Sequence, residues 1–596
     1  MFTIRFQTNT YRPDLDVSIR CDVIGDWQQD IGGNFSNDAW VFVLDENPWE
    51  NPFEFKFVLE EQVWMAGNNL KVDAVNGAEF TFTDDDVTFP PITEAIVENG
   101  IVSQTFFPRN YDANMEHDVI VIGSGFGGGV VANTCSNFGL KTLVLELGSY
   151  LFPTHVANLP RQHPLNNNVD KHIWHLWDEF KTTNYVNQPG STYGGGQGFC
   201  LGGRSVFWGG FIPRMSWWEM ELWPTNVQWY MENGGYDSAE ELLKKSVAQS
   251  GYQTQVLNYF RTHFNDYQTN SAPMAVHQPD SARNMLSTGV FSSADLLMES
   301  MLSAGPQGTQ NLTINLNQAV TQLEWQGDKI TGVNCWDLQA NMTRTYKAKH
   351  IVLAAGTVES AKIALLSNLK NPNNLIGKGM TDHPIYFTHF RLPDTSPLFN
   401  IQAGSKILLR HKNANANQHR YNILIELGAD FNQNRYVDKA IYQEMQEVKD
   451  NSMLCEIVFL FNTQLNEDNR LNQFGASGVK PQINMFDAGI SGAEWNEINA
   501  VQNDILSSIG ALPILNQQPL QPAKADLGGV AHEVGTMRMG EPGLAVVDEN
   551  LQFHGYDNLH VCDLSVFPSS PAANPSLTLA ALALRLGERL KGQITQ

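Results

Sequence analysis

The chain has 596 residues, which is too long for one hydrophobic core and predicts about two to four domains. Its 42% hydrophobic and 17% charged residues are typical of a soluble globular protein. The formal net charge of −25 argues against a nucleic-acid partner, which would need a basic face, and against docking on an anionic membrane.

The cysteines and the first residues indicate which cofactors and which cellular location to expect. None of the six cysteines forms a C-x-x-C pair, so zinc-ribbon, iron–sulfur and c-type haem signatures are missing and no metal site is predicted. Their scatter is typical of reduced, mostly buried thiols. The start lacks the apolar core of a signal peptide, and no run approaches the length of a membrane span. We therefore expect a cytoplasmic protein with no membrane partner.

Residues 1 to about 100 predict a small β-sandwich. Phe2, Ile4 and Phe6 alternate with other residues, as do the phenylalanines of FEFKFV, and this period of two indicates half-buried strands. Turn-rich pieces such as GDWQQDIGGNFSND separate the strands, and an Asp- and Pro-containing stretch near residues 84–91 has linker-like composition.

A strand–loop–helix pattern follows the predicted sandwich. Val119 to Ile122 is a short β-branched apolar run, which favours a buried parallel strand. Gly123, Gly125 and Gly128 then give G-x-G-x-x-G: the first permits a tight turn, the second lets the backbone approach a pyrophosphate, and the third lets the helix pack on the strand. The helix N-terminus would favour the phosphate charge.

A second strand completes this unit. Thr142 to Leu145 is the next apolar run, and it ends in Glu146, which lies 18 residues after Gly128 (146 − 128). A carboxylate in this place can accept hydrogen bonds from a ribose. A lone G-x-G-x-x-G can be an ordinary loop, but strand, helix, strand and acid together predict dinucleotide binding.

Three later stretches suggest how the rest is organised. Residues 191–215 are too glycine-rich for a regular element and read as backbone wrapped against a ligand; a flexible surface loop fits the embedded aromatics less well. Residues 311–356 are strand-rich and end in IVLAAG. Residues 381–525 carry scattered strands and aromatics without a nucleotide motif, and they are the natural candidate for a substrate domain.

From residue 115 to about 592 the chain resembles the glucose–methanol–choline (GMC) oxidoreductase family. The resemblance implies an α/β fold, with an FAD-binding Rossmann-like domain from 115–380 and 526–596 and a sheet-containing substrate domain from 381–525. The motifs occur in the family's order: the fingerprint at 117–148, LGGRSVFWGG (201–210), IVLAAGTVESAKIALLS (351–367), IGKGMTDHP (376–384), AHEVGTMRMG (531–540) and CDLSVFPSSPAANPSLTLAALALR (562–585).

The family oxidises alcohols by passing a hydride from carbon to flavin N5 while a base takes the hydroxyl proton. The resemblance places that base on the histidine of H-x-x-G-T, here His532, and a second catalytic position on Asn574, 42 residues later (574 − 532). Imidazole titrates near working pH, and an amide can hold the substrate oxygen without competing for its proton. The structural alternatives are a capping or core histidine and a turn residue before Pro575.

The resemblance also implies which residues hold FAD. Asp563 would approach the pyrophosphate and ribityl chain, and Val320 lies where a strand commonly contacts adenine. His383 in TDHP matches a motif near the flavin, although an interior structural role explains it equally well. The cofactor-binding candidates are Gly123, Gly125, Gly128, Glu146, Gly203, Ser205, Trp208, Gly209, Val320, Gly356 and Asp563.

Asn574 in place of a second histidine resembles the branch that contains pyranose oxidases and several sugar dehydrogenases. In pyranose oxidases a histidine one position before the tryptophan of the wrap motif is joined covalently to FAD. Here Phe207 precedes Trp208, and phenylalanine cannot form that bond. We therefore expect noncovalent FAD, and the chain departs from pyranose oxidases at this position.

The N-terminal region resembles starch-binding carbohydrate modules in VIGDW (23–27), Trp40, FEFKFV (53–58) and VWMAGNNL (63–70). In such modules exposed tryptophans stack on sugar rings, and the candidates here are Trp27, Trp49 and Trp64. Two structural alternatives remain: the tryptophans fill the sandwich core, or the domain is a scaffold for the enzyme.

Taken together, these patterns predict FAD-dependent oxidation of an alcohol group on a sugar or glycoside, with glucan as a further partner of the N-terminal domain. Oxidation of a sterol or other apolar alcohol is the alternative, as is a non-redox GMC-type lyase or photoenzyme. No motif identifies the electron acceptor, because reactivity with oxygen depends on the space and charge around flavin C4a. No motif identifies the oligomeric state either.

Overall fold

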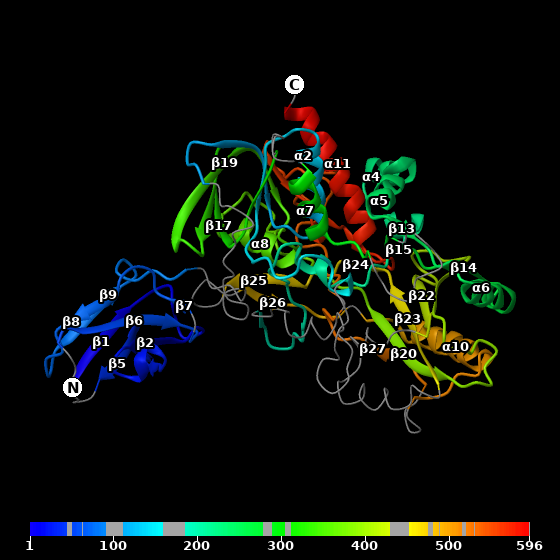
Figure 1. Ribbon diagram of the computed structural model, residues 1–596, viewed down its shortest axis with the longest axis horizontal. Helices are drawn as coiled ribbons and strands as arrows, with labels where there is room; N and C mark the ends of the chain where they lie inside the picture. Colours follow the sequence, from blue (N-terminus) through cyan, green and yellow to red (C-terminus); the bar gives the residue numbers. More distant parts are fainter. Residues whose placement is uncertain are drawn as a thin grey trace.

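The computed structural model describes residues 1–44, 51–61, 63–90, 111–158, 185–277, 289–303, 311–428, 452–474, 481–487, 489–514, 520–529 and 531–594. Its N-terminal β-domain lies at one end of the molecule, a largely parallel sheet lies near the C-terminus, and a large antiparallel sheet lies on the other side (Figure 1).

The N-terminal domain is a sandwich of two sheets. Phe6 of one sheet stacks on Phe57 of the other, with ring centroids 5.0 Å apart, because the alternating phenylalanines of both sheets point into one shared core. Trp40 belongs to this core and donates from Nε1 to the Tyr11 carbonyl oxygen. The sheets run β4(Asn34–Ser36)-β5(Ala39–Leu44)-β1(Phe2–Gln7)-β9(Glu79–Thr83) and β3(Ile31–Gly32)-β2(Val17–Cys21)-β6(Phe53–Leu59)-β7(Val63–Trp64), with β8(Leu70–Val72) beside β6.

The second domain is built on a largely parallel sheet. β10(Glu116–Ile122) pairs in parallel with β11(Thr142–Leu145) and β19(Met342–Leu353), which confirms the two strands expected from the apolar runs. The residues of β11 are all buried, as expected of a strand covered on both faces. The full order is β16(Leu312–Asn315)-β11-β10-β19-β18(Lys329–Asp337)-β17(Gln318–Gln326), with β28(Leu559–Val561) also on β19.

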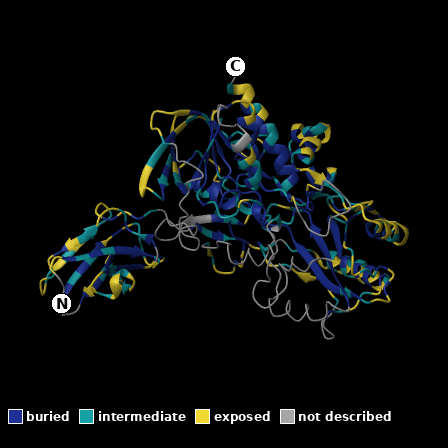
Figure 2. Cartoon of the chain, in the orientation of Figure 1, coloured by how far each residue is buried: buried dark blue, intermediate teal, exposed yellow. Residues whose placement is uncertain are grey.

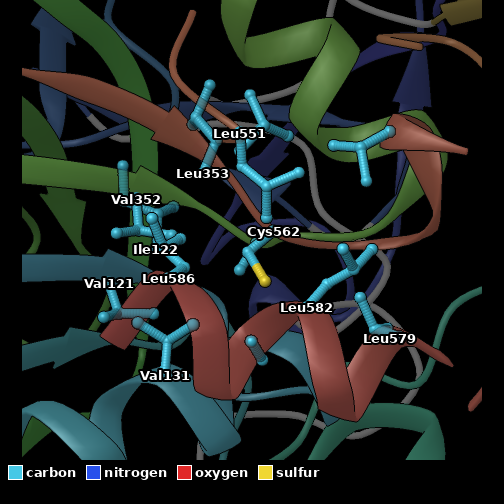
Figure 3. Close-up of a cluster of buried hydrophobic side chains, with 14 of the residues drawn as sticks. Val121, Ile122, Val131, Val352, Leu353, Leu551, Cys562, Leu579, Leu582 and Leu586 are labelled. Atoms are coloured by element: carbon cyan, nitrogen blue, oxygen red, sulfur yellow. The ribbon is translucent and has the colours of Figure 1, made fainter. Parts of the chain in front are cut away.

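Two helices cover this sheet and bring the distant ends of the chain together. α2(Phe126–Asn137) packs on α11(Ser576–Ile594), and Figure 3 shows Leu579, Leu582 and Leu586 of α11 beside Val131 of α2 and the strand residues. The start of α2 also lies against the ends of β28 and β10: a Cβ at Gly127 would overlap the Cys562 carbonyl oxygen, and one at Gly128 would overlap that of Gly123. Gly128 therefore packs helix on strand, as its place in the motif suggests.

The third part is an antiparallel sheet. One face packs on α6(Gly251–His263) and α10(Gly492–Ser508), and the other carries a smaller apolar cluster with Phe211. Figure 2 shows the central strands of both large sheets as buried, and these outer helices as partly exposed. The sheet order is β14(Tyr267–Ser271)-β21(Ser405–His411)-β22(Tyr421–Leu427)-β23(Met453–Phe461)-β20(Ile385–Leu392)-β27(Ala523–Lys524).

Shorter elements connect these layers. The helices are η1(Gly25–Trp27), η2(Val156–Asn158), η3(Gly203–Val206), η4(Trp217–Met220), α4(Thr225–Tyr230), η5(Met231–Gly235), α5(Tyr236–Leu242), α7(Ser293–Ser303), α8(Thr357–Leu366) and η8(Leu564–Val566). The short strands are β12(Val186–Asn187), β13(Lys245–Ser246), β15(Met274–Ala275), β24(Thr463–Gln464), β25(Arg470–Phe474), β26(Pro481–Asn484) and β29(Ser569–Ser570).

The predicted fold class, α/β with a preceding β-rich region, is confirmed. The six cysteines are free and buried, as their scatter indicates. Of the helices that the structure describes, none combines the length and hydropathy needed to cross a bilayer.

Candidate active site

One cavity of about 540 Å³ lies at the carboxyl ends of β10 and β11 and extends to the antiparallel sheet. Ile122 and Leu145 line it at the parallel sheet, and Leu424 and Val458 line it at the antiparallel sheet. The edge where parallel strands end is the usual ligand site of such α/β sheets.

The cavity brings together the two catalytic candidates and all of the cofactor-binding candidates except Gly128, which is used in packing α2 on the strand. His383 is not among the cavity-lining residues. The residues that line the cavity are Gly123, Gly125, Glu146, Gly203, Ser205, Trp208, Gly209, Val320, Gly356, Asp563, His532 and Asn574.

The start of α2 offers a place for a phosphate. Gly125 caps this helix without a side-chain hydrogen bond, and no atom of the described chain lies within 4 Å of the place where its Cβ would be. The free N–H groups of a helix N-terminus face such a space and favour a negative charge. This opening fits the pyrophosphate of a dinucleotide.

Glu146 is fixed at the end of β11. Its carboxylate accepts hydrogen bonds from Ser124 N at 2.9 Å, Ser124 Oγ at 2.6 Å and Gly148 N at 2.9 Å. Burial raises the pKa of the Glu146 carboxyl, and these hydrogen bonds oppose the shift. A carboxylate has about four acceptor sites, so a ribose hydroxyl can still bind in the cavity that Glu146 lines.

Asp563 ties the C-terminal segment to the start of α8. Its side chain accepts from Gly356 N at 3.0 Å, Ser360 Oγ at 2.6 Å and Ser565 N at 2.9 Å. Burial raises the pKa of this carboxyl, and the hydrogen bonds act in the opposite direction. Asp563 thereby holds two segments of the cavity wall that are 207 residues apart.

The glycine-rich stretch forms cavity wall rather than a surface loop. Trp208 donates from Nε1 to the Phe291 carbonyl oxygen at 2.7 Å, and its own carbonyl oxygen lies 2.7 Å from His155 Nε2. Burial lowers the pKa of His155 to about 4, which keeps this imidazole neutral. Phe207 also lines the cavity, and its ring meets Phe152 edge-on at 5.3 Å.

Asn574 presents a polar atom to the cavity. Its Oδ1 is buried and has no hydrogen-bond partner within the part of the chain that the structure describes. The main chain just before it is anchored, because Ala573 N donates to Glu219 Oε1 at 2.8 Å. A buried oxygen without a partner is costly, which suits an amide kept for a ligand.

His532 is oriented by His383. His383 Nδ1 lies 2.6 Å from the Pro571 carbonyl oxygen, which can only accept, so Nδ1 carries the hydrogen. His383 Nε2 is then the acceptor for the Nδ1–H of His532 at 2.9 Å. The hydrogen-bond pattern thus assigns the lone pair of neutral His532 to Nε2.

The backbone brings these two histidines together across 149 residues of sequence. Thr381 N donates to the Val534 carbonyl oxygen at 3.1 Å, and Val534 N donates to that of Thr381 at 2.9 Å. Ala531 takes a φ of 59°, a conformation that costs a non-glycine residue about 1–3 kcal/mol and often occurs at functional sites. Ala531 N donates to the Gly528 carbonyl oxygen at 3.1 Å, in the turn that leads into His532.

Two acids flank the histidines in sequence and form a buried cluster that the sequence analysis missed. Glu533 accepts from Arg204 Nη1 at 2.8 Å and from Tyr193 Oη at 2.6 Å. Asp382 accepts from Gly528 N at 3.1 Å, and burial, helped by the charge of Glu533, raises the pKa of Asp382 well above its usual range. In the sequence, the only sign of this cluster is that an acid stands next to each histidine (Asp382–His383 and His532–Glu533). The partners of these acids become visible only in the fold.

Among the described residues, no three His, Cys, Asp or Glu side chains gather closely enough to hold a metal ion. The polar groups that line the cavity include glycine backbone, the carboxylates of Glu146 and Asp563, the His532 imidazole and the Asn574 amide. This set fits a dinucleotide cofactor with a polar reaction site at one end.

Models of the GMC oxidoreductase family match residues 299–385 and 493–583. The dehydrogenase str4 of Strobilurus tenacellus is 39% identical over 62 residues, which are 10% of this chain and 10% of that protein, so the match to it spans only a tenth of its length. Paromamine 6'-oxidase of Streptomyces fradiae is 23% identical over 534 residues, which are 80% of this chain and 92% of the relative.

A solved structure of formate oxidase from Aspergillus oryzae RIB40 is similar with a TM-score of 0.59 at 15% identity, covering 81% of this chain and 99% of that one. Pyridoxine 4-oxidase from Mesorbium loti gives a TM-score of 0.52 at 16% identity, covering 80% and 99%. At these identities the two likenesses show the fold alone.

Proposed function

We propose that this chain is a GMC-type oxidoreductase with FAD as its cofactor and that it oxidises an alcohol group of a carbohydrate or glycoside. The observation that carries the proposal is the His532–Asn574 pair in one cavity, with the Nδ1–H of His532 engaged by His383. Bound FAD supplies the hydride acceptor, flavin N5. The residues implied for holding it are those of the glycine motif, Glu146, the glycine-rich wall and Asp563.

The protein side of the reaction is a single proton transfer. His532 Nε2 takes the hydroxyl proton, and the imidazolium that forms keeps its Nδ1–H bond to His383, whose Nδ1–H stays on the Pro571 carbonyl oxygen. The oxygen and nitrogen of the Asn574 amide exchange places by a flip of the side chain, so its N–H groups can hold the substrate oxygen without competing for the proton.

A carbohydrate-type substrate is supported by the asparagine at position 574 and by the relatives. One is named a paromamine 6'-oxidase, and another, 24% identical over 322 residues, is named a 5-(hydroxymethyl)furfural oxidase of Methylovorus sp.. Both names describe oxidation of polar molecules by those proteins. An apolar alcohol such as a sterol is the runner-up substrate.

Anaerobic mixing of the purified holoenzyme with sugars, sterols and simple alcohols tests the proposal. At least one polar alcohol is expected to bleach the visible absorbance of the flavin. Bleaching by sterols alone would contradict the carbohydrate substrate, and bleaching by none would contradict alcohol oxidation.

FAD is expected to be bound without a covalent link, because Phe207 stands at the position before Trp208 and has no nucleophilic atom. Acid precipitation should leave the yellow colour in the supernatant. Flavin that stays with the pellet, and with the denatured polypeptide on gel electrophoresis, would refute this.

We also propose that the N-terminal domain binds glucan. The support is a pair of half-buried indoles, Trp27 and Trp64, whose ring centroids lie 6.2 Å apart, with the Arg20 guanidinium 5.3 Å from the Trp64 ring. Two adjacent indoles can stack on successive sugar rings. The third candidate, Trp49, lies outside the described residues.

Retention of the intact chain on insoluble starch tests glucan binding. Trp27→Ala or Trp64→Ala should reduce retention, while turnover of a small soluble substrate stays as in the parent. Trp229→Ala is the matched control, because this indole is 64% exposed on a helix of the FAD-binding part. An intact chain that starch does not retain, or equal losses in all three variants, would overturn the idea.

A further inference from the structure

A row of four ionisable side chains crosses the antiparallel sheet. Lys406 of β21 pairs with Glu426 of β22, Glu426 pairs with Glu456 of β23, and Glu456 pairs with His389 of β20. The Lys406 ammonium forms an ion pair with Glu426, and His389 Nε2 lies 3.1 Å from Glu456 Oε1. Only 4–17% of each side chain is exposed.

This row stands out against an apolar surface. Two residues further along the strands the register gives Leu408, Leu424, Val458 and Phe387, all in the cluster around Phe211. At about 3.4 Å per residue the two rows are about 7 Å apart. Lys406 Nζ also lies 5.7 Å from the centre of the Phe211 ring.

Two members of the row face the cavity that holds the reaction site. Lys406 and Glu456 line it together with Leu424, Val458 and Leu460, whereas Glu426 and His389 are not among its lining residues. His532 and Asn574 line the same cavity. Buried charges cost desolvation energy, and apolar residues of similar volume would stabilise the sheet at least as well, so packing alone does not explain this row.

We propose that Glu456 and Lys406 determine substrate specificity by binding hydroxyl groups on the part of the alcohol remote from the oxidised carbon. The inference rests on the alcohol oxidation proposed above and adds the substrate class: a polyhydroxylated, sugar-sized alcohol. The ammonium has three donors, of which Glu426 takes one, and the carboxylate has acceptor capacity beyond its contact with His389. Lys406 and Glu456 lie on strands separated by β22, about 10 Å apart at the backbone. They therefore offer a donor and an acceptor to different hydroxyl groups of one ring, since each hydroxyl can both give and take a hydrogen bond.

Two kinds of alcohol with similar shape, one with ring hydroxyls and one without, test whether the cavity recognises hydroxyl groups or only an apolar ring. Methyl pyranosides of glucose, mannose and galactose carry a primary hydroxyl on a six-membered ring, and cyclohexylmethanol has that shape without ring hydroxyls. The holoenzyme should prefer at least one pyranoside, measured as kcat/KM of flavin reduction. Glu456→Gln should lower this preference about tenfold or more, mainly through KM, because a hydrogen bond to a charged group is lost.

Glu426→Gln is the matched control, since it removes the same charge from the same row outside the cavity. A loss of preference clearly smaller than that of Glu456→Gln is expected, whereas equal losses would show a general charge effect and overturn direct binding. A parent that prefers cyclohexylmethanol, or a Glu456→Gln variant with unchanged preference and normal FAD content, would also overturn it. Lys406→Met serves as the second variant, with the same expected loss.

Binding of alcohols to the oxidised holoenzyme, measured without turnover, tests the specificity site independently of alcohol oxidation. Pyranosides should perturb the visible spectrum of the oxidised holoenzyme at lower concentration than cyclohexylmethanol, and Glu456→Gln should abolish the difference. If no alcohol reduces the flavin but this binding pattern holds, alcohol oxidation is wrong and the specificity site stands. If reduction occurs but the parent shows no binding preference, the specificity site is wrong.

Discussion

His532→Ala is expected to slow reduction of the bound FAD by the preferred alcohol by at least about a hundredfold, the usual scale for loss of a general base. The His383 contact directs the Nδ1–H of His532 inward, so Nε2 is the nitrogen that can accept a proton from a ligand in the cavity. Alanine leaves Asn574 in place but removes the proton acceptor. Stopped-flow mixing without oxygen measures this rate directly.

The FAD content of the variant should stay near that of the parent, because His532 is one residue in a long cofactor cavity. His554→Ala is a suitable control: this histidine lies in the same C-terminal part, contacts the Gly540 carbonyl oxygen and is not among the cavity-lining residues. The control should reduce its flavin at the parent rate. Equal rates in the parent and His532→Ala would remove His532 from the mechanism.

Glu533→Ala is expected to lower the free energy of unfolding by about 3–5 kcal/mol, the scale for removing one partner of a buried ion pair. Glu533 is 1% exposed at its side chain, and its loss leaves the Arg204 guanidinium and the Tyr193 hydroxyl without their acceptor. Because Arg204 is 20% exposed, water can solvate it in part, and the lower end of the range is expected. Urea denaturation followed by flavin fluorescence measures the change.

Asp328→Ala provides the comparison, because Asp328 forms an exposed ion pair with Lys370. Exposed pairs contribute about 0–1 kcal/mol, so the denaturation midpoint should hardly move. A Glu533→Ala midpoint that also coincides with the parent would show that the buried cluster does not stabilise the fold.

The nucleotide-binding unit and the strands of the sandwich could be predicted from local sequence patterns. Val119–Ile122 and Thr142–Leu145 could be predicted because a buried parallel strand needs a continuous apolar run, and a phosphate turn needs glycine at fixed spacing. The N-terminal phenylalanines recur at every second residue, which predicts strands with one buried face, and β1 and β6 have this alternating burial.

Two features of the site could not be predicted from the sequence, because they depend on how distant strands and segments pair in the fold. His383 and His532 meet through a two-bond bridge between segments 149 residues apart, and no local pattern encodes it. The row from Lys406 to His389 depends on the pairing of four strands, where a slip of one residue would turn each side chain to the other face. Among the tryptophans of the N-terminal resemblance, Trp40 fills the core while Trp27 and Trp64 lie together at intermediate burial.

The most direct test of alcohol oxidation at this cavity is the rate of flavin bleaching without oxygen, using the preferred alcohol with hydrogen or deuterium on the carbinol carbon. Hydride transfer in the reduction step predicts full bleaching in both cases and a clearly slower rate with deuterium. A flavin that dithionite reduces but that no alcohol bleaches, or that bleaches at the same rate with both isotopes while chemistry limits the rate, would contradict the account.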